Sequence, residues 1–172
     1  AHEELDTIYI MGTVRISGRS SWTLEKGQIM RYPEYNGNLI SVSSGSNFVL
    51  SHITIDGAAS YGLTNTKALI SLGGTMEIGE DAILRSNNVS AASGVESRGG
   101  AIMCSGKLTM NGGVICNCSA EFGGGVFLYG DGVFTMNDGV MESNIATGKS
   151  RAGQGGAVMI THDSQMIMNG GV

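Results

Sequence analysis

Carboxylate pairs are the first residues in this sequence to examine for chemistry, because glycoside hydrolysis requires two carboxyl groups roughly 5–10 Å apart. Asp56 and Glu142 occupy the same outward position of a repeat that runs through the chain, but three copies separate them. At about 4.8 Å per stacked strand, that separation is roughly 14 Å. Glu80, Asp81 and Asp138 share one corner of the repeat and lie two copies apart. The acids therefore do not predict a catalytic pair, and no catalytic residue is assigned.

The histidines and cysteines do not form a catalytic or metal-binding motif either. His52 and His162 fall at different places in the repeat, and the third histidine lies in the N-terminal tail, so no Ser–His–Asp arrangement is predicted. Cys116 and Cys118 have one residue between them, whereas a zinc half-site usually has two to four. We expect small, half-buried thiols, with a link from Cys104 to either of the others left open. No metal or cofactor is predicted.

The elements that position these residues are copies of one repeated stretch. LTMNGGVICN at 108–117 returns in altered form as FTMNDGVMESN at 134–144 and as MIMNGGV at 166–172. Extended over the whole chain, the copies follow one another at about 26 to 32 residues, a spacing typical of solenoids. Five positions form columns that are apolar except at Gly100: Val14, Ile40, Ala68, Gly100, Val126 and Val158; Ile16, Val42, Ile70, Ile102, Leu128 and Ile160; Trp22, Phe48, Met76, Leu108, Phe134 and Met166; Leu24, Leu50, Ile78, Met110, Met136 and Met168; and Ile29, Ile55, Ile83, Ile115 and Met141.

The pattern within each copy predicts strands rather than helices. Apolar and other residues alternate with a period of two, which is typical of a strand with one buried face. Corners rich in Asn, Asp and Gly, such as 111–113 and 137–139, separate the last two strands of a copy. Three short strands and three corners per copy indicate an all-β fold, a parallel β-helix of about six partial coils. The coils are expected to begin near residues 14, 40, 68, 100, 126 and 158.

Composition limits the classes of function. The 172 residues, of which 41% are hydrophobic, are enough for a single domain with a core, which we place at residues 1–172. The net charge of −5 argues against nucleic-acid binding, because nucleic-acid-binding proteins normally present a basic face. No run approaches the roughly 18 consecutive apolar residues that a membrane span requires. Because the last copy stops partway through, we expect a piece of a longer protein.

Variation in length falls, in this alignment, in one connection of the repeat, between the last strand of a copy and the first strand of the next. Such loops stack on one side of a solenoid, often the side that meets partners. Asn87, Asn117 and Asn144 follow the third strand and are expected to form turns and to hydrogen-bond neighbouring coils. The loops are either ordinary solvated loops or a contact surface for a glycan or a protein. The candidate ligand-binding residues are Tyr32, Tyr35, Tyr61, Glu96, Arg98, Lys149 and Arg151.

Several segments resemble a known group of repeats. GGAIMCSGKLTMNGGVICNCSA, GGGVFLYGDGVFTMNDGVMESNIA and GGAVMITHDSQMIMNGGV resemble the Gly-rich right-handed β-helix repeats of bacterial surface proteins. DTIYIMGTVRISG and LSHITIDG resemble the first coils of wall-attached adhesins of Gram-positive bacteria, many from the gut. The resemblance implies a right-handed, pectate-lyase-like β-helix and an extracellular or cell-surface location. It carries over no catalytic residues, because the matched motifs are structural.

These features favour a non-catalytic adhesion or display module of a larger secreted or wall-attached bacterial protein. Its variable loops would bind a host or microbial glycan or a surface protein. The alternatives are a fragment of a carbohydrate-active enzyme whose active coils lie outside this chain, and a structural spacer. An open end of a β-helix presents unpaired strand edges. We therefore expect a continuation of the chain, end-to-end contacts between molecules, or aggregation.

Overall fold

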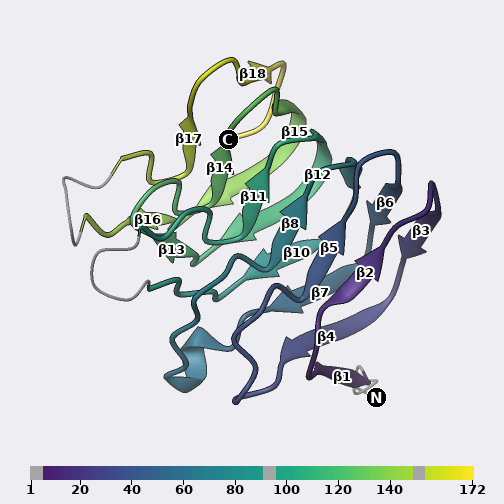
Figure 1. The fold of residues 1–172 in the computed structure, drawn as a ribbon, viewed down its shortest axis with the longest axis vertical. Helices are drawn as coiled ribbons and strands as arrows, with labels where there is room; N and C mark the ends of the chain where they lie inside the picture. The colour runs from purple at the N-terminus through teal and green to yellow at the C-terminus, as the bar shows by residue number, and fades with distance from the viewer. Residues whose placement is uncertain (1–5, 91–95, 149–153) are drawn as a thin grey trace.

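The computed structural model describes residues 6–90, 96–148 and 154–172. These residues form an all-β structure with one short 3₁₀ helix, η1 (Ala59–Tyr61). Every strand pair among them is parallel. Figure 1 shows the strands stacked side by side in curled sheets, from β1 near the N-terminus at the lower right to β18 near the C-terminus at the top.

A six-stranded sheet contains the first strand of each copy of the repeat. Its order is β2-β5-β8-β11-β14-β17, so neighbouring strands come from successive copies. All its strands are three residues long. In the inner strands of the sheet, the first and third residues of each strand are buried in the core. The strands are Val14–Ile16, Ile40–Val42, Ile70–Leu72, Ile102–Cys104, Val126–Leu128 and Val158–Ile160.

A ten-stranded curled sheet contains the other strands of each copy. The two halves of β12 pair with different strands, because Lys107–Met110 lies beside β9 and Val114–Cys116 lies beside β10. The sheet therefore bends where the register of β12 and β15 is irregular. Its members are β1 (Thr7–Ile10), β3 (Ser21–Leu24), β4 (Gly27–Arg31), β6 (Asn47–Leu50), β7 (Ile53–Asp56), β9 (Thr75–Ile78), β10 (Ile83–Arg85), β12 (Lys107–Cys116), β15 (Val133–Glu142) and β18 (Gln165–Met168). A separate pair is formed by β13 (Ser119–Ala120) and β16 (Ile145–Ala146).

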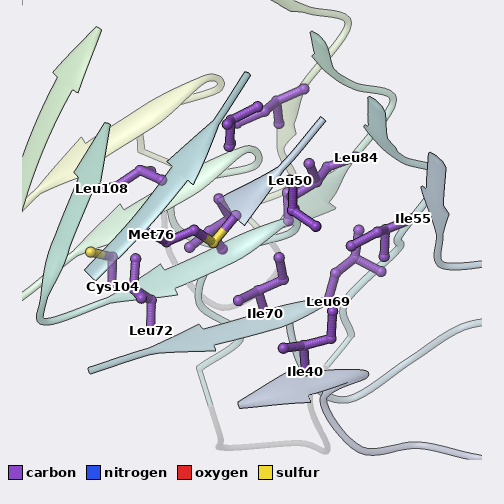
Figure 2. Packing of buried hydrophobic residues seen from close by; sticks show 14 of the residues in the cluster. Ile40, Leu50, Ile55, Leu69, Ile70, Leu72, Met76, Leu84, Cys104 and Leu108 are labelled. Atoms are coloured by element: carbon purple, nitrogen blue, oxygen red, sulfur yellow. The ribbon is translucent and has the colours of Figure 1, made fainter. Parts of the chain in front are cut away.

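The core confirms the columns that begin at Trp22 and Leu24. Each member pairs with the next one in the predicted order, from β3 through β6, β9, β12 and β15 to β18. Figure 2 shows Leu50, Met76 and Leu108 gathered with side chains of the six-stranded sheet in the enclosed space. Trp22 and Met168 differ from the prediction of an inward position, because they are 49% and 57% exposed on edge strands.

The column that includes Ile83 is wrong by one residue. Leu84, and not Ile83, pairs with Ile55 on one side and with Ile115 on the other. Leu84 is fully buried, whereas Ile83 is only partly buried. The corner before β10, residues 79–82, holds one residue more than the alignment assumes, with Asp81 at a φ of 53°. A shift by one residue exchanges the two faces of a strand, so the inward side chain changes.

The two columns of the six-stranded sheet are wrong by two residues in the third and fourth copies. Ile70 and Ile102 occupy the row assigned to Ala68 and Gly100, where they continue the row of Ile40. The second row there contains Leu72 and Cys104 instead of Ile70 and Ile102. A shift of two residues keeps the same face inward, so the prediction of burial survives although the register was wrong.

Short corners cause this two-residue shift. After β8 and β11 the corners are only Gly73–Gly74 and 105–106, whereas residues 43–46 follow β5. A Cβ on Gly74 would lie 2.4 Å from the backbone oxygen of Ser43, and a Cβ on Gly106 would lie 2.0 Å from that of Gly74. Glycine therefore permits the close approach of these corners. The expectation that length varies in only one connection is wrong.

Candidate functional site

Two of the predicted ligand-binding residues form an ion pair on the outer side of the six-stranded sheet. Arg98 Nη2 donates to Glu96 Oε2 over 2.7 Å, and both residues belong to the connection between β10 and β11. The guanidinium carbon of Arg98 also lies 5.4 Å from the ring centroid of Phe127 on β14. A cation over an aromatic face is attracted by the ring quadrupole. The ring and the carboxylate together position the guanidinium.

Hydrogen bonds between the segment of Glu96 to Arg98 and the segment of Glu121 and Phe122 hold the ion pair in position. Ser97, between the two charged residues, is buried, and its Oγ accepts a hydrogen bond from the Glu121 amide at 2.7 Å. The amide of Phe122 donates to the carbonyl of Ser97 at 3.0 Å. Because alternate residues of an extended segment point to opposite sides, Glu96 and Arg98 point outward. Arg98 forms a parallel bridge with Phe122, which is itself bridged to Gln154 in the next loop.

A groove of about 580 Å³ lies beside the ion pair, and we call it the Arg98 groove. Phe127 is the middle residue of β14, so its side chain lies on the opposite face of the strand from Val126 and Leu128, which are in the core; on that outer face Phe127 is itself buried, with 4% exposure. The ring centroids of Phe127 and Tyr129 are 6.1 Å apart. The groove is lined by Glu96, Arg98, Phe122, Phe127, Tyr129, Gly130, Gln154, Met159, Thr161, His162 and Asp163.

A second hollow, of about 630 Å³, lies on the other side of the same ion pair. It shares Glu96 and Arg98 with the Arg98 groove and extends over the preceding strands of the six-stranded sheet. Met103 of this hollow and Phe127 and Met159 of the groove are paired neighbours in one outward row. The other lining residues of the second hollow are Asn38, Thr66, Lys67, Ala68 and Ser71. The two hollows therefore follow the direction in which the strands stack.

The three predicted tyrosines are not among the residues that line these hollows. Tyr35 is partly buried against the core, and its hydroxyl bonds Thr13 Oγ1 at 2.5 Å and donates to the Asn38 carbonyl at 3.1 Å. Tyr61, in η1, is 71% exposed, and Tyr32 is partly buried beyond the end of β4. These contacts give Tyr35 a structural role. Lys149 and Arg151 lie outside the described residues.

The aromatic floor of the groove was missed in the sequence analysis. Phe127 stands in a strand whose three residues are all apolar, so alternation did not mark it as outward. Phe122 lies in a Gly-rich loop, and Tyr129 begins a corner. Its position in the aligned repeat could have identified Phe127, because a residue between two inward columns must point to the outer face of the strand.

A buried polar cluster supports the loops next to the second hollow. Asn87 is fully buried, and its Nδ2 donates to the carbonyls of Lys67 at 3.0 Å and Gly100 at 2.6 Å. Its Oδ1 accepts from Asn65 Nδ2 at 2.7 Å and from Arg31 Nη2 at 3.3 Å. The prediction that Asn87 hydrogen-bonds neighbouring copies is confirmed. Burial lowers the pKa of Arg31 to about 10, so the guanidinium stays charged at neutral pH.

The other two asparagines behave differently from each other. Asn144 also bonds a neighbouring copy, because its Oδ1 accepts from the Cys118 amide at 3.1 Å and its Nδ2 donates to the Ile115 carbonyl at 2.8 Å. Asn117 is exposed at a φ of 52°, as a turn residue. Both predicted roles, the turn and the bond between copies, therefore occur, but in different residues.

The three cysteines are free and buried. Burial raises the pKa of Cys104 to about 11 and that of Cys118 to about 12, so both remain thiols at neutral pH. The thiolate is the reactive form of cysteine, which makes these residues poor nucleophiles. Among the described residues, no group of three His, Cys, Asp or Glu side chains could hold a metal ion.

Some acidic residues stabilise the fold, and others line the Arg98 groove. Asp56 is buried, and its carboxylate accepts from Arg85 Nε at 2.8 Å and from the Ala58 amide at 2.7 Å. These bonds anchor the end of β7. Glu96 and Asp163, by contrast, both line the Arg98 groove. Sequence reasoning did not bring these two acids together, because they occupy different parts of their copies.

No family model, curated protein or solved structure matches this chain. The class of protein therefore rests on the fold and on the site. In the part of the chain that the structure describes, no helix is long and apolar enough to cross a membrane.

Proposed function

We propose that the chain is a segment of right-handed parallel β-helix that binds carbohydrate in the Arg98 groove. The interleaved order of parallel strands and the in-register apolar rows support a single continuous solenoid. The resemblance to Gly-rich surface repeats supports a place in a secreted or wall-attached bacterial adhesin. In this proposal the β-helix is a rigid scaffold, and the binding residues are carried by loops and by outward strand positions.

The observation that carries the proposal is the Arg98–Glu96 pair beside an aromatic floor. Binding pockets combine apolar and aromatic walls with a few polar groups that fix orientation. A sugar ring has an apolar C–H face that fits against an aromatic ring and hydroxyls that both donate and accept hydrogen bonds. Arg98 supplies N–H donors and Glu96 supplies carboxylate acceptors. Tyr129, which is half-buried, supplies accessible aromatic surface, and the buried Phe127 lies beneath the guanidinium of Arg98.

The two hollows favour an extended, uncharged ligand. Because they lie on either side of one ion pair and follow the stacking direction, several sugar units of a chain could contact them in turn. The lining of the groove includes the carboxylates of Glu96 and Asp163 and the guanidinium of Arg98. This balance disfavours polyanionic glycans through repulsion between like charges. A neutral oligosaccharide is the proposed ligand.

A glycan array with matched variants tests this function. The wild-type chain should bind a set of neutral oligosaccharides, and Arg98→Ala and Tyr129→Ala should each lower the affinity for them at least about tenfold, which corresponds to about 1.4 kcal/mol. Tyr61→Ala is the control, because Tyr61 is exposed and does not line the groove. Binding that survives Arg98→Ala, or is lost in Tyr61→Ala, would place the ligand elsewhere. An array without hits would favour a spacer.

Hydrolysis is a second candidate, favoured by the presence of two acids, Glu96 and Asp163, in one groove. Glycosidases use such a pair as acid and as base or nucleophile. Arg98 Nη2 already bonds Glu96 Oε2 at 2.7 Å, so this carboxylate is engaged as a hydrogen-bond acceptor in the groove. Incubation of an array hit with the protein, followed by chromatography of the sugar, separates the two functions. Cleavage that stops in Glu96→Gln and in Asp163→Asn would establish the enzyme.

A further inference from the structure

Three asparagines in this sequence are followed directly by glycine. They are Asn36, Asn111 and Asn169. An asparagine side chain in this context is readily attacked by the next backbone nitrogen, because glycine has no Cβ to hinder the approach. Since the three sites share this intrinsic chemistry, the structure around each site decides which of them reacts.

Solvent access does not distinguish the three sites. All three asparagines are exposed. Asn111 and Asn169 lie at equivalent corners of the stack, each directly after a strand segment of the ten-stranded sheet, whereas Asn36 lies in the connection between β4 and β5. The sites differ instead in the hydrogen bonds that their side chains make.

A chain of side-chain hydrogen bonds connects successive copies of the repeat along the corner of Asn111 and Asn169, and we call it the amide ladder. Asn111 Nδ2 donates to Glu77 Oε1 at 2.9 Å, and Asn137 Nδ2 donates to Asn111 Oδ1 at 2.7 Å. Asn169 Nδ2 donates to Asn137 Oδ1 at 2.7 Å. Each of these amides is therefore bonded to the neighbouring copy along the stacking direction.

The amide ladder opposes attack by the following backbone nitrogen. The attack requires the side-chain amide to rotate toward that nitrogen, and this rotation breaks hydrogen bonds of the ladder. Asn111 would lose two such bonds, one on each side. At Asn169 the attacking nitrogen is bonded as well, since the Gly170 amide donates to the Met136 carbonyl at 3.3 Å. Each bond that must break slows the reaction.

Asn36 lacks this protection. Among the described residues, neither its side-chain amide nor the backbone N–H of Gly37 has a hydrogen-bond partner. The bonds of this dipeptide are made by its carbonyl oxygens, because Arg31 Nη1 donates to the Gly37 carbonyl and Thr66 Oγ1 donates to the Asn36 carbonyl at 3.0 Å. The attacking nitrogen and the side-chain carbon that it attacks are therefore both free, in adjacent residues.

The packing of the loop requires the glycine of this dipeptide. A Cβ on Gly37 would lie 2.0 Å from the hydroxyl oxygen of Tyr35. Tyr35 is packed against the core, and its hydroxyl bonds Thr13 and the Asn38 carbonyl. A bulkier residue that would hinder the attack therefore does not fit at position 37.

We propose that Asn36 is a site of spontaneous deamidation and that the amide ladder protects Asn111 and Asn169 from the same reaction. The Gly37 nitrogen forms a bond to Asn36 Cγ, and the bond from Cγ to Nδ2 breaks. Nδ2 leaves as ammonia and takes the proton of the Gly37 amide. Water then opens the cyclic imide at either carbonyl, which gives an aspartate or an isoaspartate in place of Asn36.

The product would alter the surroundings of the second hollow. The Asn36 carbonyl is bonded to Thr66, and Thr66, Asn38 and Lys67 all line this hollow. Deamidation adds a negative charge to the loop, and isoaspartate also lengthens its backbone by one carbon. The reaction itself does not depend on the proposed function, whereas an effect on sugar binding does.

Peptide mapping by mass spectrometry tests the proposal, because trypsin places the three sites in separate peptides, residues 32–67, 108–149 and 152–172. The chain is incubated at mildly alkaline pH, either folded or unfolded in guanidinium chloride. In the folded protein, Asn36 should convert at least about tenfold faster than Asn111 and Asn169, because two hydrogen bonds must break at each of the other sites. In the unfolded protein the three rates should become similar.

A variant of the ladder tests the protection directly. Asn137→Ala removes a bond from both Asn111 and Asn169, so conversion at these two sites should rise at least about threefold while conversion at Asn36 stays unchanged. Asn47→Ala is the matched control, since Asn47 is an exposed amide on β6 outside the ladder. It should leave all three rates as they are in the wild type.

Four results would overturn the proposal. One is equal conversion at the three sites in the folded protein, and another is conversion of Asn36 only after unfolding. The third is a difference between the sites that persists in guanidinium chloride, as expected if sequence rather than structure sets the rates. The fourth is an Asn137→Ala protein in which Asn111 and Asn169 convert no faster than in the wild type.

Discussion

At the scale of single residues, Asn87 is a fully buried amide at the centre of a polar cluster. It is an uncharged side chain without exposure to water, and its amide joins segments that lie far apart in the sequence. One of these segments contains Lys67, which lines the second hollow. A fully bonded buried amide is stabilising and specifies one arrangement, whereas a partly bonded one is destabilising. Asn87 therefore links the core to the candidate site.

Replacement of this side chain tests that role. Asn87→Ala should lower the free energy of unfolding by roughly 3 kcal/mol or more, because several buried groups lose their partner together. Asn47→Ala is the matched control, since Asn47 is exposed on β6 and should change stability by less than about 0.5 kcal/mol. Urea unfolding followed by circular dichroism measures both. Equal and small losses in the two variants would show that the cluster does not stabilise the fold.

The buried thiols predict how stability responds to alkaline pH. An ordinary thiol, as in the unfolded chain, has a pKa near 8.5, whereas the pKa of folded Cys118 is raised to about 12 by burial. The folded state therefore retains a proton that the unfolded state releases. The contribution is fully present below about pH 8.5 and is lost as the pH rises toward 12, with about 2 kcal/mol lost by pH 10.

The variant Cys118→Ala isolates this effect. Its free energy of unfolding should fall less between pH 7.5 and pH 10 than that of the wild type, even if its stability at pH 7.5 is lower because of the smaller side chain. Groups other than Cys118 titrate in both proteins and cancel in the comparison. The same pH dependence in both proteins would mean that this thiol is not shielded from solvent.

At the scale of elements, glycine corners set the register of the six-stranded sheet. In the tight corners after β8 and β11, the backbone of the preceding copy lies so close to Gly74 and Gly106 that neither position has room for a side chain. This contact allows Leu72 and Cys104 to enter the core row. The strands that carry the groove, β14 and β17, follow β11 in the same sheet.

A substitution at one of these corners tests their importance. Gly106→Ala should lower the free energy of unfolding by more than about 2 kcal/mol, because its Cβ would lie 2.0 Å from the Gly74 oxygen. Gly12→Ala is the control, since no atom lies within 4 Å of a Cβ built there. Thermal unfolding of both variants measures the difference. A Gly106→Ala protein as stable as the wild type would contradict the close packing of the corners.

Alternation was sufficient to predict strands but not their exact register. The segment from Ala68 to Leu72 has apolar residues at every second position, so a shift by two residues is invisible to a pattern of period two. Only the length of the corner distinguishes the two registers, and corner length depends on contacts between copies. At β10, Ile83 and Leu84 are both apolar, so the pattern could not choose between them either.

Only part of the candidate site could be predicted from the sequence. Glu96 and Arg98 were identified as charges in a variable loop, and the structure brings them together. The aromatic floor was not identified, because Phe127 and Tyr129 lie in the repeated part of the chain. Proximity between a loop and the strand of the next copy arises from stacking, which becomes visible only when the copies are placed beside one another.

At the scale of the whole molecule, the sides and the ends of the stack have different properties. The side formed by the six-stranded sheet carries two hollows joined by one ion pair, whereas the ends carry unpaired edges and apolar residues. We propose that the side with the hollows binds sugar. This proposal relies on the regular parallel arrangement of the strands.

The most direct test of the carbohydrate-binding proposal is a nuclear magnetic resonance titration of the ¹⁵N-labelled protein with the strongest array ligand. We predict that amide signals of Arg98, Phe127 and Thr161 shift in a saturable manner, because these residues lie on the Arg98 groove. Signals of Tyr32 and Tyr61 should stay unchanged. Saturable shifts confined to Tyr32 and Tyr61, with the groove unaffected, would contradict the assignment of the groove as the binding site.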